Sequence, residues 1–354
     1  MKDYHVFYNR EAHVSRLLTA FHMLDQRGEA NVSFIENVNN FRGTPHSQVV
    51  ELEAGGNVYA FDMCDAFALN NEKGKAYLNK VSLYFKRSYS KEIDAGLSED
   101  LMDKIRPYGF DFYTTFPGNP IDERSLSVKG RIKQTMRTLS GYDKCSYAEA
   151  FERKANQTRG NPQIIFMTRL WDPDEILLEG DLDPALRSYR EYMIEERHKI
   201  NADRTKIVRE LRRIYGNDFV GGIQSGSFAE RYSPDILIPR ELTRKKTYLH
   251  KMQSADICIG SMGLHKSTGW KTGEYIAASR AIVAERLVYD VPGDFAAGKN
   301  YIPFDSVEEC LSAVDKLYHD PDAVYAMKKA NEKYYQQYLE PVAQLKNALL
   351  QCEG

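Results

Sequence analysis

The stretch ADICIGSMGLHKSTGWKTGEYIAASRAIVAE, residues 255–285, is the most informative part of the sequence. Its apolar runs predict a strand over 255–260 and another over 281–284, with a helix over 271–279 between them. The first strand enters that helix through a loop of small and polar residues. A strand, a loop and a helix followed by another strand are typical of a parallel α/β sheet.

The loop and the start of this helix have the features of a diphosphate site. Backbone N–H groups at a helix start lack partners within the helix and attract anions. Lys271 and Lys266 would add whole positive charges, while Ser267 and Thr268 could donate hydrogen bonds or cap the helix. Glu274 shares a helix face with Lys271, and its carboxylate could accept both hydroxyls of a ribose. The alternative is a capped helix with a surface Lys–Glu pair.

The same alternation of strands and helices extends outward in both directions. It predicts further strands over 4–8, 31–36, 48–52, 58–63, 81–85, 163–168, 219–223 and 235–239. It predicts helices over 11–26, 127–139, 147–156, 185–216 in two parts, 246–254, 308–318 and 323–350, the last bent at Pro341. We therefore expect an α/β protein with two Rossmann-like domains that face a cleft.

The turn-rich segment 157–162, QTRGNP, suggests where the two domains meet. We place an N-terminal domain at 1–158 and a C-terminal domain at 159–354.

Composition narrows the function classes. The 354 residues include 48 Lys and Arg against 50 Asp and Glu, a net charge of -2 that gives no global attraction for nucleic acid. The five cysteines are scattered without metal-ligand spacing, which is typical of free thiols in a reducing compartment. The polar N-terminus and the absence of a long apolar run predict a cytoplasmic location, with the inner face of a membrane as an alternative.

Four segments carry a resemblance to a known family. KTGEYIAASRAIVAE (271–285) resembles the nucleotide-sugar motif of GT-B glycosyltransferases of the group 1 type. QIIFMTRLWDP (163–173), YLHKMQSADICIGSMG (248–263) and residues 306–339 resemble the segments that open, precede and close the C-terminal domain of that family. The resemblance covers residues 160–340, and the N-terminal half matches only in architecture.

The resemblance implies that the C-terminal domain, 159–354, is nucleotide-sugar-binding and that the N-terminal domain, 1–158, is acceptor-binding. It also implies that the last helix, about 323–350, packs back toward the N-terminal domain. Since Arg169, Lys271 and the helix start would stabilise the departing diphosphate, we expect no metal or other cofactor. The donor site would comprise Arg169, Lys266, Ser267, Thr268, Gly269, Lys271, Thr272 and Glu274. Retaining members often carry two Glu residues eight positions apart, but Lys266 stands eight positions before Glu274. Whether the reaction inverts or retains the anomeric configuration therefore stays open.

Four further residues, Asp62, Asp65, Arg87 and His265, are considered for chemistry at the acceptor. Asp62 and Asp65 follow an apolar strand, and we select Asp62 as the general base, with a helix cap as the alternative for Asp65. His265 could contact the donor or transfer a proton, although a loop histidine often does neither. Arg87 could bind donor phosphate or an acidic acceptor, or form a structural ion pair.

The sequence thus predicts a glycosyltransferase of polysaccharide biosynthesis that acts on a glycan, lipid-linked or other hydroxyl acceptor. A nucleotide-sugar 2-epimerase or a non-catalytic sugar-nucleotide binding protein is the alternative. The basic helix segment RTKIVRELRRIYG, 204–216, is expected to have one solvated and one buried face, with contact to a membrane as the alternative.

Overall fold

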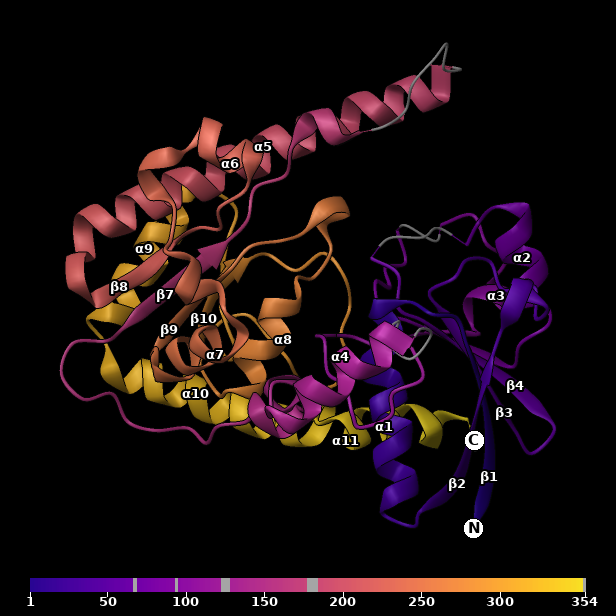
Figure 1. Cartoon of the computed structure of the whole chain (residues 1–354). Helices are drawn as coiled ribbons and strands as arrows, with labels where there is room; N and C mark the ends of the chain where they lie inside the picture. The colour runs from indigo at the N-terminus through magenta and orange to yellow at the C-terminus, as the bar shows by residue number, and fades with distance from the viewer. Residues whose placement is uncertain (66–68, 93–94, 122–127, 177–183, 353–354) are drawn as a thin grey trace.

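The computed structural model describes residues 1–65, 69–92, 95–121, 128–176 and 184–352, and Figure 1 shows its two α/β units. The first unit is a six-stranded sheet in the order β2-β1-β3-β4-β5-β6. Its strands are β1 (Lys2–Tyr8), β2 (Ala30–Glu36), β3 (Val49–Ala54), β4 (Asn57–Asp62), β5 (Leu83–Lys86) and β6 (Ile105–Pro107). Its helices are α1 (Ser15–Gln26), α2 (Glu72–Leu78) and α3 (Glu99–Met102).

Strand β3 is antiparallel to both of its neighbours, β1 and β4, whereas the other strand pairs of this sheet are parallel. The turn from β3 to β4 passes through Gly55 and Gly56, whose φ values of 58° and 80° lie in the left-handed region. Glycine adopts that region without steric cost, so this pair allows the tight hairpin.

The second unit is an all-parallel, five-stranded sheet in the order β11-β10-β9-β7-β8. Its strands are β7 (Ile164–Thr168), β8 (Phe219–Ile223), β9 (Ile257–Gly260), β10 (Ala281–Glu285) and β11 (Ile302–Phe304). Its helices are α5 (Pro184–Tyr215), α6 (Ser227–Tyr232), α7 (Lys245–Ser254), α8 (Trp270–Ala277), α9 (Val307–Tyr318) and α10 (Pro321–Tyr334). The α/β class with two Rossmann-like units is therefore confirmed.

The chain returns to the first unit at its end. After α10, a π-helical turn (Tyr335–Leu339) leads into α11 (Pro341–Gln351), which packs against α1. Leu345 and Leu349 of α11 belong to the same hydrophobic core as Leu17 and Phe21 of α1. In Figure 1 this last helix, in yellow, runs below the second unit to the strands of the first.

Three local expectations were wrong. Residues 147–156 form only a short 3-10 turn, Ala148–Ala150, instead of a helix. The backbone of Arg153 bonds to the end of α8 and the residues after it, because its N–H donates to the Ala277 carbonyl and its carbonyl accepts from the Ser279 hydroxyl. Residues 235–239 form a 3-10 turn and a single bridge to β8 instead of a strand. The two helical parts expected at 185–216 are one helix of 32 residues, α5.

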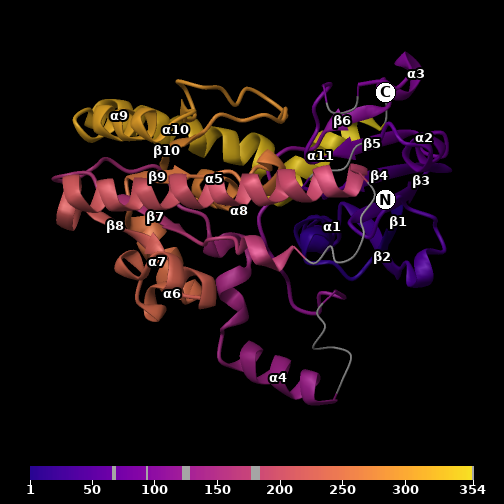
Figure 2. The ribbon, with the colours of Figure 1, turned by 90° about the horizontal axis from the view of Figure 1, so that it is seen from above.

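One more helix, α4 (Val128–Leu139), lies in the connection between the two sheets. Figure 2 shows it standing away from both of them. Within the described part of the chain, no helix is both long and apolar enough to cross a membrane.

Candidate functional site

A cavity of about 580 Å³ lies between the two units. The second unit lines most of it, with residues at and after the carboxyl ends of β7 and β9 and at the start of α8. Among the described residues, the first unit contributes His13, Asp65 and Arg87 to the lining. A cavity beyond the carboxyl ends of parallel strands is the usual ligand position in such sheets.

Two cations in this cavity rest on aromatic rings instead of carboxylates. The Arg169 guanidinium lies 4.0 Å from the centre of the Trp171 ring, and the Lys271 ammonium lies 4.0 Å from the centre of the Tyr248 ring. Neither cation forms an ion pair within 4.0 Å with a carboxylate of the described chain. Burial lowers the pKa of Arg169, and it lowers the pKa of Lys271 to about 8. Glu274 near Lys271, and Glu175 and Asp65 near Arg169, offset this burial only in part. Partly desolvated cations without a direct ion pair attract anionic ligands.

Glu274 is buried at the floor of the same cavity. Its Oε1 accepts a hydrogen bond from Lys245 Nζ at 2.8 Å, and its Oε2 accepts one from the Tyr248 hydroxyl at 2.6 Å. Burial opposes ionisation, but Lys245 and Lys271 outweigh it and lower the pKa of Glu274. The surface Lys271–Glu274 pair considered from the sequence is therefore absent, since Glu274 is only 6% exposed and pairs with Lys245.

Arg87 links the two units. Its guanidinium forms an ion pair with Asp65 of the first unit and donates from Nη2 to the Thr268 carbonyl of the second at 2.7 Å. The structural ion pair considered from the sequence thus exists, and Arg87 lines the cavity as well.

Arg204 departs from the solvated face expected for its helix segment. It is only 5% exposed, and it donates to the Ser261 hydroxyl at 3.0 Å and to the Arg169 carbonyl at 2.7 Å. Burial lowers its pKa to about 10. Arg204 therefore holds the loops after β7 and β9 together at the edge of the cavity.

Seven of the sequence-predicted residues line the cavity together: Arg87, Arg169, Ser267, Thr268, Gly269, Lys271 and Glu274. His265, Lys266 and Thr272 do not line it. His265 and Lys266 adopt left-handed backbone conformations with φ values of 59° and 54°, and the His265 ring stacks on Tyr189 of α5. Thr272 is buried within α8.

Asp62, selected as the general base, also lies outside the cavity lining. Its side chain has no exposed surface, its Oδ1 accepts from the Cys64 N–H and its Oδ2 accepts from the Tyr84 hydroxyl, both at 2.8 Å. The selection of Asp62 as the cleft carboxylate was therefore wrong, and Asp65, three residues later, is the carboxylate of the first unit that lines the cavity.

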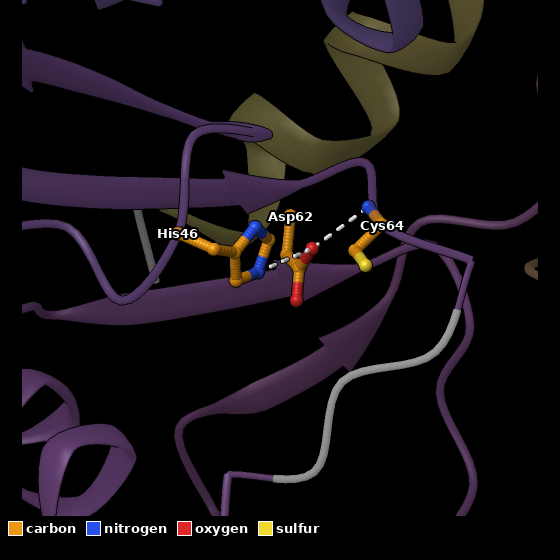
Figure 3. Close-up of side chains that lie close together, drawn as sticks. All are labelled: His46, Asp62 and Cys64. Atoms are coloured by element: carbon orange, nitrogen blue, oxygen red, sulfur yellow. Dashed lines mark hydrogen bonds and ion pairs between the residues drawn. The ribbon is translucent and has the colours of Figure 1, made fainter. Parts of the chain in front are cut away.

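His46, Asp62 and Cys64 lie close enough together to be considered as metal ligands (Figure 3). Their ligand atoms lie within 4.8 Å of one another, and zinc binds such residue types. The Gln48 N–H donates to His46 Nδ1 at 3.3 Å, which places the imidazole proton on Nε2. Nε2 faces Asp62 Oδ1 at 3.3 Å. A protonated Nε2 cannot bind a metal, so this arrangement favours a structural polar cluster.

No pattern in the sequence indicated several residues of the cavity. His13, at the start of the first helix, lies with its Nε2 4.0 Å from Asp65 Oδ2 and its ring against Trp270 of α8. Lys245 and Tyr248 of α7 meet Glu274 from 29 and 26 residues away in the chain. These contacts join separate elements, so no local spacing predicts them.

Comparisons with known proteins give matches at the level of structure alone. No family model matches the chain, and no curated protein matches it. Among solved structures, Anabaena HepE in complex with UDP is similar at 11% identity, covering 99% of this chain and 100% of its own, with a TM-score of 0.41. Neisseria meningitidis UDP-GlcNAc 2-epimerase bound to UDP-GlcNAc is similar at 12% identity, covering 95% and 73%, with a TM-score of 0.39.

The C-terminal domain of a glycosyl transferase group 1 family protein from Francisella tularensis is also similar, at 11% identity and a TM-score of 0.36. The match covers 53% of this chain and 95% of that domain. Glycosyltransferases and epimerases thus both occur among the structures that this chain resembles.

Proposed function

We propose that this chain is a glycosyltransferase that takes its sugar from a nucleotide-diphosphate donor. The observation that carries the proposal is the pair Arg169 and Lys271, two partly buried cations without a carboxylate partner in the described chain. A diphosphate supplies the negative charge that this pair lacks. Its charge grows as the sugar leaves, so the pair would stabilise the transition state more than the bound donor.

Glu274 would bind the ribose of the donor nucleotide. Its two oxygens are held by Lys245 and Tyr248, and each oxygen keeps a second lone pair that could accept a ribose hydroxyl. This carboxylate is ionised and fixed before any ligand arrives, which reduces the cost of ordering it on binding.

The acceptor hydroxyl would approach from the first unit, whose His13 and Asp65 line the same cavity. Either side chain could take the proton of that hydroxyl, the role of a general base. These two residues therefore replace Asp62 and His265 in the proposed mechanism.

Calorimetric titration tests the donor site. We expect nucleoside diphosphates to bind, and Arg169→Met or Lys271→Met to weaken binding about 10–100-fold, since a hydrogen bond to a charged group contributes about 1.5–3 kcal/mol. Lys251→Met, which removes an exposed lysine of α7, is the control and should bind as the wild type. Wild-type affinity in both cavity variants would place the donor elsewhere.

A nucleotide-sugar 2-epimerase is the second candidate, because His13 and Asp65 could also exchange a proton at a bound sugar. Incubation with the sugar nucleotide alone separates the two activities. An epimerase converts the donor without an acceptor, whereas a glycosyltransferase requires a hydroxyl acceptor for transfer. A chain that binds donors without any turnover would be a binding protein.

A further inference from the structure

Helix α4 carries an apolar stripe that the rest of the described chain leaves uncovered. Its members are Val128 (73% exposed), Ile132 (58%), Met136 (66%) and Leu139 (82%). With 3.6 residues per turn, these four positions fall within about 80° of the helix circumference. Isolated exposed apolar residues are ordinary, but four on one face of one helix form an apolar surface that no described residue covers.

The rest of the helix is basic. Lys129, Arg131, Lys133 and Arg137 provide its charges, and residues 128–142 contain no Asp or Glu. At helical spacing, Lys129 and Arg131 flank the stripe on opposite sides. Tyr142, 51% exposed, follows the helix and lies under the Arg137 guanidinium, 4.3 Å from the ring centre.

This charge is local, since the whole chain has a net charge of -2. Figure 2 shows α4 projecting from the body of the molecule, so the helix can meet a flat surface before the two sheets do.

We propose that α4 docks on an anionic lipid surface, with its stripe in the interface and its lysines and arginines against the headgroups. Basic amphipathic helices bind membranes in this way, through buried apolar area and attraction to anionic lipid. A second copy of the chain fits less well, because two facing α4 helices would bring eight cations together without an acidic partner. The earlier alternative, helix segment 204–216, is excluded because its Ile207, Val208 and Leu211 are buried in the core.

Co-sedimentation of the full chain with vesicles tests the proposal. We expect binding to vesicles of equal parts phosphatidylcholine and phosphatidylglycerol, little binding to phosphatidylcholine alone, and release by salt. The triple variant Lys129→Glu/Arg131→Glu/Lys133→Glu should lose at least about 100-fold in partition, since each cation near an anionic surface contributes about fivefold. The double variant Ile132→Glu/Met136→Glu should lose at least about tenfold.

Matched controls use exposed positions elsewhere. Lys251→Glu/Lys316→Glu/Lys333→Glu makes the same change of charge on α7, α9 and α10 and should bind vesicles nearly as the wild type. All variants should keep the wild-type melting temperature and nucleotide affinity, because α4 is exposed and lies outside the cavity. Vesicle binding that is absent in the wild type, or equal in the α4 and control variants, would overturn the proposal. So would a dimer in light scattering that the α4 variants abolish.

Discussion

Lys271 holds a positive charge in surroundings that disfavour it. Its ammonium lies over the Tyr248 ring, and burial lowers its pKa to about 8. The pKa of an ordinary lysine is about 10.4, so the unoccupied cavity makes the ammonium easier to deprotonate than it is in water, although it stays mostly charged at neutral pH. An anionic ligand would favour the charged form, which makes binding dependent on pH.

We expect the affinity for a nucleoside diphosphate to be nearly constant below about pH 8 and to fall above it, by up to about tenfold per pH unit. The reason is that the free protein loses the Lys271 proton above that pH, and binding must restore it. Calorimetry across this range, in buffers of different ionisation enthalpy, measures both the affinity and the proton uptake. Lys271→Arg keeps its charge and should remove the dependence; an unchanged slope in that variant would assign the titration to another group.

The same shift has the opposite sign for the stability of the unliganded protein. A lysine pKa that is lower in the folded state means that the unfolded chain binds more protons between about pH 8 and pH 10. The free energy of unfolding should therefore rise through that window. We expect Lys271→Met to melt at a higher temperature than the wild type at neutral pH, although it binds donor more weakly.

Asp62 is a buried side chain whose two oxygens accept hydrogen bonds from the Cys64 N–H and the Tyr84 hydroxyl. Asp62→Asn should lower the free energy of unfolding by about 1–3 kcal/mol, because its NH2 group replaces one acceptor oxygen and leaves a buried donor without an acceptor. The rate of the chemical step should change little. Urea denaturation and steady-state kinetics measure the two effects, and a stable variant with turnover reduced about 100-fold or more would return Asp62 to the mechanism.

At the scale of elements, helix α8 lies in close contact with Asp111 and Phe112, in the segment before α4. A Cβ on Gly273 would lie 2.8 Å from Phe112 Cδ1 and 3.1 Å from the Asp111 carbonyl oxygen. Phe112 has no exposed surface and the other contact is backbone, so neither neighbour can move freely. The glycine therefore allows α8, which carries Lys271 and Glu274, to sit against this segment.

Gly273→Ala should lower the free energy of unfolding by about 1–3 kcal/mol, although alanine is the better helix former. It should also weaken donor binding, since the displaced helix moves Lys271 and Glu274. Thermal melts and calorimetry measure these effects. Gly226→Ala is the control, because a Cβ at Gly226 meets no atom within 4 Å. A Gly273→Ala variant as stable as the wild type would contradict this prediction, because it would show that Phe112 and Asp111 move to make room for the added methyl group.

At the scale of the whole molecule, α11 packs the C-terminal end of the chain against α1, near the N-terminus. Gln344 Oε1 accepts a hydrogen bond from Arg16 of α1 at 2.5 Å, and its Nε2 donates to the Tyr108 and Phe110 carbonyls at 2.9 and 3.0 Å. The first unit therefore completes its core with a helix that follows the second unit in the chain.

We expect Leu345→Ala to lower the free energy of unfolding by about 2–5 kcal/mol, because Leu345 is fully buried in the core of the first unit. Leu350→Ala makes the same substitution in the same helix at a position that is 67% exposed. It should change the stability by less than about 0.5 kcal/mol. Chemical denaturation followed by tyrosine and tryptophan fluorescence compares the two, and equal effects would mean that α11 does not stabilise the first unit.

Much of the fold was determined by the sequence alone. The strands and helix of residues 255–285 follow from apolar periodicity, which is a local property, and their alternation implies parallel sheets. Short elements could not be predicted in this way, because a period is visible only over several residues. Strands β6 and β11 have three residues each, too few to show a period.

Only the tertiary structure decided which side chains meet. Successive side chains of a strand point to opposite faces, so Asp62 at the end of β4 turns to Tyr84, while Asp65, beyond the strand, reaches the cavity. Lys245 donates a hydrogen bond to Glu274, and Arg204 donates one to Ser261, because the fold brings separate elements together. Periodicity along the chain reports the face on which a residue lies, but the partner across that face depends on how the elements pack.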